Sequence, residues 1–331
     1  MNDFFRGLGC FLLLTVTACG AQAGADRVNL FPKLHVGQII RYQVGYSATT
    51  DQSTESNVAT PMAPDGGQTN ANIVLQVEVE DLRAEAGREL ARLRTRIFET
   101  DATAANDSMT AGSAPNASGA AKSGASEQTG KTVELTLHGD GQVTGVQGLD
   151  ALSPAEQAAW REWADRFAGA AAFPPKGVKP GGKWKSDEPV PNALLAGLSW
   201  QKESQYVNDA PCAAMKLTRQ GDPAVGLQPL ETCAVILTTA ILRQKSSPND
   251  ATPEDYKLHD LRNTGTAQGK NQTISYFSLT TGLLVRSTED ANQSMSVTVS
   301  KSDGSNQVHY GIDAESHSRV LLIADASPKQ P

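Results

Sequence analysis

Residues 274–287 read ISYFSLTTGLLVRS, and this stretch decides the fold. Two apolar runs flank the turn residues Thr281-Gly282, which is the pattern of two antiparallel strands joined by a hairpin. Further strand-like runs follow after short turns, at Met295–Val299, Val308–Ile312 and Val320–Ile323. Because short turns connect strands that lie side by side, this part of the chain predicts an antiparallel meander.

The upstream sequence shows the same alternation. Apolar residues occupy every second position of Ile73–Val79, and arginines alternate with apolar residues around Leu93–Ile97, as in strands with one solvated face. Other strand-like runs are Ile39–Tyr46, Val133–Leu137, Leu198–Val207 and Cys233–Leu242. We therefore expect a mainly β (α+β) fold, a curved antiparallel meander or half-barrel.

One helix interrupts the strands. Residues Ser153–Glu156 (SPAE) combine a capping serine, a proline in the first turn and a glutamate at the third helical position, which is the capping-box arrangement. Trp160, Trp163 and Phe167 recur at helical spacing, so their rings share one face. This face predicts packing on the concave side of the sheet, either as plain core or as a wall that faces a ligand.

The N-terminus has the pattern of an export signal. The apolar run at 7–18 (GLGCFLLLTVTA) is too short to span a bilayer, and residues 1–23 fit a secretory signal peptide. Val16–Cys19 resembles a bacterial lipobox, which would place a lipid on Cys19, whereas Ala21–Ala23 offers an ordinary cleavage site. We expect a protein that is periplasmic or anchored in the bacterial cell envelope by lipid alone.

The remaining cysteines support export. Cys10 would leave with the signal, and Cys19 would carry lipid or leave, so Cys212 and Cys233 remain as one pair in strand-like sequence. Such a pair predicts a structural disulfide in an oxidising compartment. A redox-active pair would have the closer Cys-x-x-Cys spacing.

Composition also divides the chain. Thr103–Gly130 consists almost wholly of small and polar residues and predicts a disordered loop, and Asp51–Asn70 is similarly polar. The segment before this loop holds too few strands to fold alone. We therefore expect a single β-rich domain over 28–323, followed by a disordered tail at 324–331.

Catalytic and metal-binding patterns are not found in the sequence. The five histidines form no pair at ligand spacing, and the acidic stretch around His259 is typical of a solvated loop. Residues 139–141 (GDG) lie in a strand–turn–strand context, not before a helix that could hold a phosphate. A pI near 5.3 and a net charge of −7 disfavour nucleic acid as a partner. We expect no enzyme activity, metal or cofactor.

The order of these elements resembles a group of uncharacterised secreted bacterial proteins and lipoproteins. The resemblance lies in the signal pattern, the aromatic helix, the segment Gly177–Trp184 and the hairpin that continues as Gly282–Ser287. The lipoprotein carriers of the LolA/LolB type are similar in shape, a half-barrel whose concave face could hold an acyl chain. The resemblance implies an envelope protein and supplies no functional residue.

Two functions therefore remain open. In the first, a hydrophobic or lipid ligand binds in the concavity, against Trp160, Trp163 and Phe167, which requires an apolar cavity of roughly 300 Å³ or more. In the second, the core is filled and the protein is a structural or interaction lipoprotein that recruits an envelope protein. An exposed apolar patch would then replace the cavity. An unrecognised hydrolase comes third and would require a polar cleft with convergent titratable groups.

Overall fold

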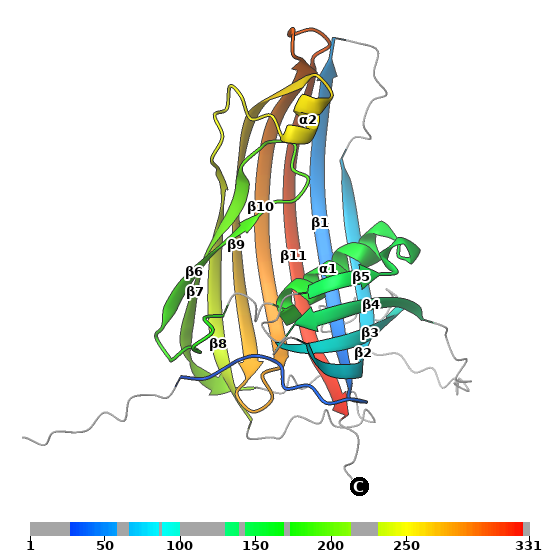
Figure 1. The fold of residues 1–331 in the computed structure, drawn as a ribbon, viewed down its shortest axis with the longest axis vertical. Coiled ribbons are helices and arrows are strands. Elements are labelled where there is room, and N and C mark those ends of the chain that lie inside the picture. Colours follow the sequence, from blue (N-terminus) through cyan, green and yellow to red (C-terminus); the bar gives the residue numbers. More distant parts are fainter. Residues whose placement is uncertain are drawn as a thin grey trace, which may run out of the picture.

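The computed structural model describes residues 27–57, 66–85, 88–99, 130–138, 143–168, 173–212 and 231–326. The expected signal peptide at 1–23, the proposed lipidation residue Cys19 and residues 103–129 lie outside the described residues. Within them, eleven strands form one antiparallel sheet with the order β5-β4-β3-β2-β1-β11-β10-β9-β8-β7-β6. The sheet is open and strongly curved (Figure 1), which confirms the expected fold class.

The strands differ greatly in length. The five strands in or beside the middle of the sheet are the longest, and the two edge strands are short. The bounds are β1 Ile39–Ser56, β2 Gly67–Glu85, β3 Arg88–Glu99, β4 Lys131–His138, β5 Val143–Gln147, β6 Lys183–Pro189, β7 Leu198–Pro211, β8 Thr232–Gln244, β9 Leu261–Ser278, β10 Leu284–Lys301 and β11 Val308–Ala326. The helical elements are η3 Leu149–Ala151, α1 Pro154–Phe167 and α2 Glu254–Leu258.

The first and last strands pair with each other. β1 runs antiparallel to β11 along its whole length, from Ile39 opposite Ala326 to Ser56 opposite Val308. This pairing places the two chain-terminal strands at the centre of the sheet and unites the two halves of the meander. Because every other neighbour is also a neighbour in sequence, the whole sheet is built from hairpins and this one closure.

One expectation was wrong at the polar ends of β1 and β2. We expected Asp51–Asn70 to lack regular structure, but β1 continues to Ser56 and β2 begins at Gly67. The backbone ladder needs no apolar side chains, and Asp51 lies opposite Asp313 in an equally polar part of β11. β11 also continues to Ala326, three residues past the boundary expected at 323.

Helix α1 lies on the concave face of the sheet (Figure 1). Its start is the expected capping box: Ser153 Oγ accepts from the Glu156 amide at 3.3 Å, and the Glu156 carboxylate accepts from the Ser153 amide at 2.7 Å. Lys131 Nζ lies 2.7 Å from the same carboxylate, which joins the helix to the first residue of β4. The helix start is therefore fixed both locally and by the sheet.

The main core fills the space between α1 and the sheet. Inward-pointing residues of β1 to β4 lie at alternate positions and are almost fully buried beneath the helix. They include Ile40, Tyr42, Val44, Ile73, Leu75, Val77, Val79, Leu93, Ile97, Val133, Leu135 and Leu137. A second, smaller core lies under residues 190–198 and contains Leu195, Leu198, Leu242, Ala251 and Val297.

The N-terminal segment crosses the lower end of the sheet in Figure 1. Val28 forms an isolated bridge with Val178, and the Lys33 amide donates to the Thr281 carbonyl at 2.8 Å. Gly282 has a φ of 70°, and a Cβ there would lie 2.0 Å from the Phe31 carbonyl oxygen. Glycine is thus required both for the β9–β10 turn and for the close approach of this segment.

Candidate functional site

The three aromatic candidates lie in the core. Trp160, Trp163 and Phe167 are 2%, 0% and 1% exposed. The rings of Trp163 and Phe167 stack at 5.0 Å, and Trp163 lies 6.1 Å from the ring of Tyr42. The side chains of the sheet meet the helix directly, so these rings offer no open face to a ligand. The aromatic stripe of α1, for which plain core and a ligand-facing wall were both open, is buried at the centre of the concave face.

An open apolar cleft lies at the lower end of the sheet, which we call the N-terminal cleft. Its volume is about 640 Å³. The N-terminal segment forms one wall, and the ends of β2, β3 and β4 form the other. The lining residues are Asn29, Phe31, Pro32, Lys33, Leu34, Leu82, Arg83, Ala84, Ala91, Leu137 and His138. A cleft of this size falls within the range of small-molecule sites.

The cleft combines apolar walls with cations at its rim. Leu82 is 39% exposed, although a leucine of a well-packed core would be covered. Lys33 and Arg83 are the lysine and arginine of the lining, and His138 adds an imidazole. Lys33 Nζ donates to the Thr280 carbonyl at 2.8 Å, so it is held at the turn beside the cleft. This arrangement suits a ligand with an apolar chain and an anionic end.

A second cavity lies between α1 and the other half of the sheet, and we call it the α1 pocket. It is smaller, about 80 Å³. It is lined by Asp165, Arg166, Phe173, Trp184, Lys202, Ser204, Ile236, Thr238, Ala240, Asn271, Thr273, Ser275 and Phe277. Aromatic and aliphatic side chains alternate here with hydroxyl, amide and charged groups, so its chemistry differs from that of the cleft.

A buried ion-pair network forms one side of the α1 pocket. Arg166 pairs with Glu289 of β10 and lies 3.2 Å from Glu162 one turn earlier on the helix. Thr273 donates to Glu289 at 2.7 Å, and Ser318 donates to Glu162 at 2.9 Å. The network joins α1 to β9, β10 and β11, and it marks the change from the apolar to the polar part of the concave face.

Among the titratable groups that line the α1 pocket, Asp165 has the clearest shift in pKa. Asp165 belongs to the exposed residues of α1, although many protein atoms lie around its carboxylate. Burial raises its pKa to about 6, and the charges of Glu162 and Glu188 add to the rise while Arg166 and Lys202 oppose it. Such a shift in a cavity is a recognised sign of a functional group.

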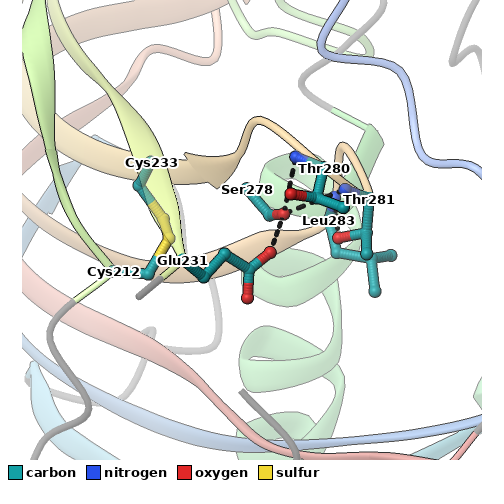
Figure 2. The surroundings of a disulfide bond; sticks show 7 residues. All are labelled: Cys212, Glu231, Cys233, Ser278, Thr280, Thr281 and Leu283. Atoms are coloured by element: carbon teal, nitrogen blue, oxygen red, sulfur yellow. Dashed lines mark hydrogen bonds between the residues drawn. A yellow bond between two sulfur atoms is a disulfide. The ribbon is translucent and has the colours of Figure 1, made fainter. Parts of the chain in front are cut away.

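The disulfide lies at the lower end of the sheet. Cys212, just after β7, is bonded to Cys233 of β8, and both are buried (Figure 2). Glu231 beside it accepts a hydrogen bond from Ser278, whose oxygen also accepts from the amides of Thr280 and Thr281 at 3.2 and 2.9 Å. The bond therefore sits next to the β9–β10 turn that holds the N-terminal segment.

Other candidate chemistry is sparse in the part of the chain that the structure describes. No group of three or more His, Cys, Asp or Glu side chains within it is placed to hold a metal ion. His259 is exposed at the end of α2, and His309 lies 3.1 Å from Thr298 in the sheet. Among the described residues, no helix has the length and apolar character needed to cross a membrane.

Comparisons with known proteins give low similarity. No protein-family model matches the chain, and no curated protein does so either. A Bacteroides fragilis protein inferred to be exported, with a YmcC-like fold, matches at 8% identity and a TM-score of 0.30, over 92% of this chain and 100% of that chain. A Parabacteroides distasonis protein inferred to be a lipoprotein matches at 8% identity and a TM-score of 0.29, over 91% of this chain and 100% of that chain.

Identities and TM-scores this low leave the function to be argued from the sites themselves. Sequence analysis missed both cavities. It did not single out Leu34, Leu82 or Asp165.

Proposed function

We propose that this protein is an exported envelope protein that binds an amphiphile with an acyl chain and an anionic end in the N-terminal cleft. The observation that carries the proposal is the cleft of about 640 Å³ with apolar walls. Its volume exceeds the roughly 300 Å³ at which small-molecule sites begin. Lys33 and Arg83 lie where the anionic end of a chain seated on Leu34 and Leu82 would be attracted.

The position of the cleft agrees with a membrane-facing role. The described chain begins at Arg27, two residues before Asn29 of the cleft lining, and Cys19 precedes it by only the residues 20–26. A lipid on Cys19 would keep this end of the sheet close to the membrane surface, which is the source of an acyl ligand. Mass spectrometry of the protein isolated from a bacterial envelope tests the anchor, because acylated Cys19 and unmodified Gly24 give different N-terminal masses.

Fatty-acid binding tests the cleft directly. Residues 24–331, free of detergent, are titrated with the fluorescent fatty acid 11-(dansylamino)undecanoic acid, and oleate is used to displace it. We expect saturable binding that Leu82→Glu weakens at least tenfold, because a carboxylate is placed in the apolar wall. Ile241→Glu is the matched control, since Ile241 is 43% exposed and Leu82 39%, and Ile241 does not line the cleft.

The two variants distinguish the outcomes. If the Ile241→Glu variant binds the fatty acid and the Leu82→Glu variant does not, the result supports the cleft as the site. Equal loss in both, or no saturable binding by the wild-type chain, rejects it. Circular dichroism of both variants shows whether each keeps the strand content of the wild type.

One observation favours the second function, recruitment of an envelope protein. On the outer face of the sheet, Ile274 of β9 lies opposite Leu237 of β8, and Ile274 is 38% exposed. Tyr276 points to the same face, and Cζ of Arg286 lies 3.6 Å from the centre of its ring. This small apolar patch would suit a protein partner. Ile274→Lys would then abolish capture of that partner and leave fatty-acid binding unchanged.

A further inference from the structure

The α1 pocket lies apart from the N-terminal cleft. The cleft is formed by the N-terminal segment and β2 to β4, whereas the pocket is formed by α1, β6 to β9 and Phe173. No lining residue is shared between the two cavities. A function of the pocket would therefore be independent of acyl binding in the cleft.

The pocket holds unpaired donors. Trp184 Nε1 and Arg166 Nε are both buried, and neither has a hydrogen-bond partner within the described structure. A buried donor without a partner loses its hydrogen bond to water and gains nothing in return. Both residues line the pocket, so an acceptor that reached these atoms from outside the chain would be stabilised there.

The pocket also holds an unpaired acceptor. Asp165 lines it, and among the described residues its carboxylate forms neither a hydrogen bond nor an ion pair, although the charges of Arg166 and Lys202 act on it from a distance. A ligand that satisfies both Asp165 and the two donors must carry groups that donate as well as accept. Hydroxyl groups have this property, while a carboxylate or phosphate only accepts.

The charges around the pocket disfavour an anion. Asp165, Glu162, Glu188 and Glu289 are acids, and the bases Arg166 and Lys202 are already paired with three of them. Adding an anion next to the unpaired Asp165 would be repulsive. A neutral ligand avoids this cost and keeps its hydrogen bonds.

Aromatic side chains form the apolar part of the lining. The ring of Phe173 lies 5.5 Å from that of Trp184 and 5.2 Å from that of Phe277. Such rings pack well against the C–H face of a saturated ring. With a volume of about 80 Å³, the pocket admits part of one ring from its open side and no acyl chain.

We propose that the α1 pocket binds one neutral sugar unit, held by hydroxyl contacts to Asp165, Arg166 and Trp184 and by the aromatic rings beside them. A sugar carries several hydroxyls that donate and accept, no charge, and apolar C–H faces. The combination matches each unsatisfied group of the pocket. The exported location that we propose would place the pocket among the glycans of the envelope.

Saturation-transfer NMR tests the proposal on residues 24–331. The probes are D-glucose, D-galactose and N-acetyl-D-glucosamine at millimolar concentration, with D-glucuronic acid as the anionic comparison. We expect saturation transfer to at least one neutral sugar. Trp184→Phe, which keeps a ring and removes the N–H, and Asp165→Asn should each weaken its affinity at least tenfold.

Two controls separate a lost contact from a lost fold. Trp200→Phe makes the same change at an inward-facing tryptophan that does not line the pocket, and Asp255→Asn makes the same change at an exposed acid of α2. Both should bind as the wild type does. Absence of transfer to all three neutral sugars, a preference for glucuronic acid, or equal loss in variants and controls would overturn the proposal. Fatty-acid binding is measured in parallel and should be unchanged in Trp184→Phe.

Discussion

Trp160 of α1 donates a hydrogen bond of 3.0 Å from Nε1 to Thr95 Oγ1 of β3, and Thr95 in turn donates to the Val133 carbonyl of β4 at 2.8 Å. Thr95 is completely buried at an inward position otherwise occupied by apolar side chains. The indole and the hydroxyl thus satisfy each other inside the core. This polar contact fixes the rotation of α1, which apolar packing alone would leave less specific.

Trp160→Phe removes this hydrogen bond and keeps a ring in place. Thr95 Oγ1 still donates to Val133, so no buried donor loses its partner. We expect the free energy of unfolding to fall by about 1 kcal/mol from the lost bond, with a further loss from the smaller ring. Urea unfolding followed by circular dichroism measures the change. An unchanged midpoint would show that the contact does not contribute to stability.

Trp163→Ala tests whether the aromatic stripe is core or ligand wall. Because Trp163 is fully buried against Tyr42 and Phe167, we expect the free energy of unfolding to fall by about 3–5 kcal/mol. Binding of the dansylated fatty acid by the remaining folded protein should stay within about twofold of wild type, since Trp163 does not line the N-terminal cleft. A large loss of affinity with little loss of stability would instead assign the stripe to the ligand.

Removing one charge of the buried pair Arg166–Glu289 should lower the free energy of unfolding. Glu289→Gln removes one of the two carboxylates that pair with Arg166 and leaves Glu162 as its partner, so we expect a loss of about 1–3 kcal/mol in unfolding free energy. Replacing both residues, with Arg166→Met and Glu289→Leu, should restore part of this loss. The control is Arg83→Met, because Arg83 is 72% exposed and its pairing with Asp81 is solvated. Its change should stay below about 1 kcal/mol.

The disulfide should stabilise the fold by limiting the unfolded chain. Replacing Cys212 and Cys233 together by serine opens a loop with a sequence separation of 21. The chain-entropy relation gives a loss of about 3 kcal/mol for a loop of this size. Thermal unfolding of this double variant, compared with the wild type with and without dithiothreitol, measures the effect. The expectation would be wrong if the wild type melted at the same temperature after dithiothreitol had reduced the unfolded chain.

Elements whose start or turn is specified by a few neighbouring residues could be predicted from the sequence. The capping box at Ser153–Glu156 and the turn at Thr281-Gly282 each lie within a few residues, so local chemistry alone specifies them. The polar ends of β1 and β2 could not be recognised, because the partner that makes Asp51 part of a strand is Asp313. Tertiary pairing there overrides weak strand propensity.

The sites depend even more on tertiary structure. The α1 pocket brings together Asp165, Trp184, Lys202 and Asn271 from four separate elements, and no spacing in the sequence relates them. The aromatic stripe of α1 was recognisable, but whether it faces a ligand or the core depends on how closely the sheet curves around it. The cleft at Leu82 depends on where the N-terminal segment crosses the sheet.

Asp165 makes stability depend on pH in a direction opposite to that of a salt-bridged carboxylate. Its pKa in the folded protein is raised to about 6 by burial, with Glu162 of α1 and Glu188 of β6 adding to the rise and Arg166 and Lys202 opposing it. In an unfolded chain an aspartate titrates near about 3.9. Between these values the folded state binds more protons than the unfolded state, so this group's contribution to stability falls as the pH rises from about 4 to about 6.

Asp165→Asn removes this titration. Near pH 3, below both pKa values, the carboxyl is mostly protonated in the folded and the unfolded wild type, so the variant and the wild type should have similar melting temperatures. At pH 7.5 the wild type holds an unpaired charge in the α1 pocket, and the neutral variant should therefore melt higher. The difference between the two proteins isolates Asp165 from every other titrating group, and Asp255→Asn serves as the exposed control. A variant that melts lower than the wild type at pH 7.5 would show that the folded protein stabilises the ionised carboxylate, contrary to its raised pKa.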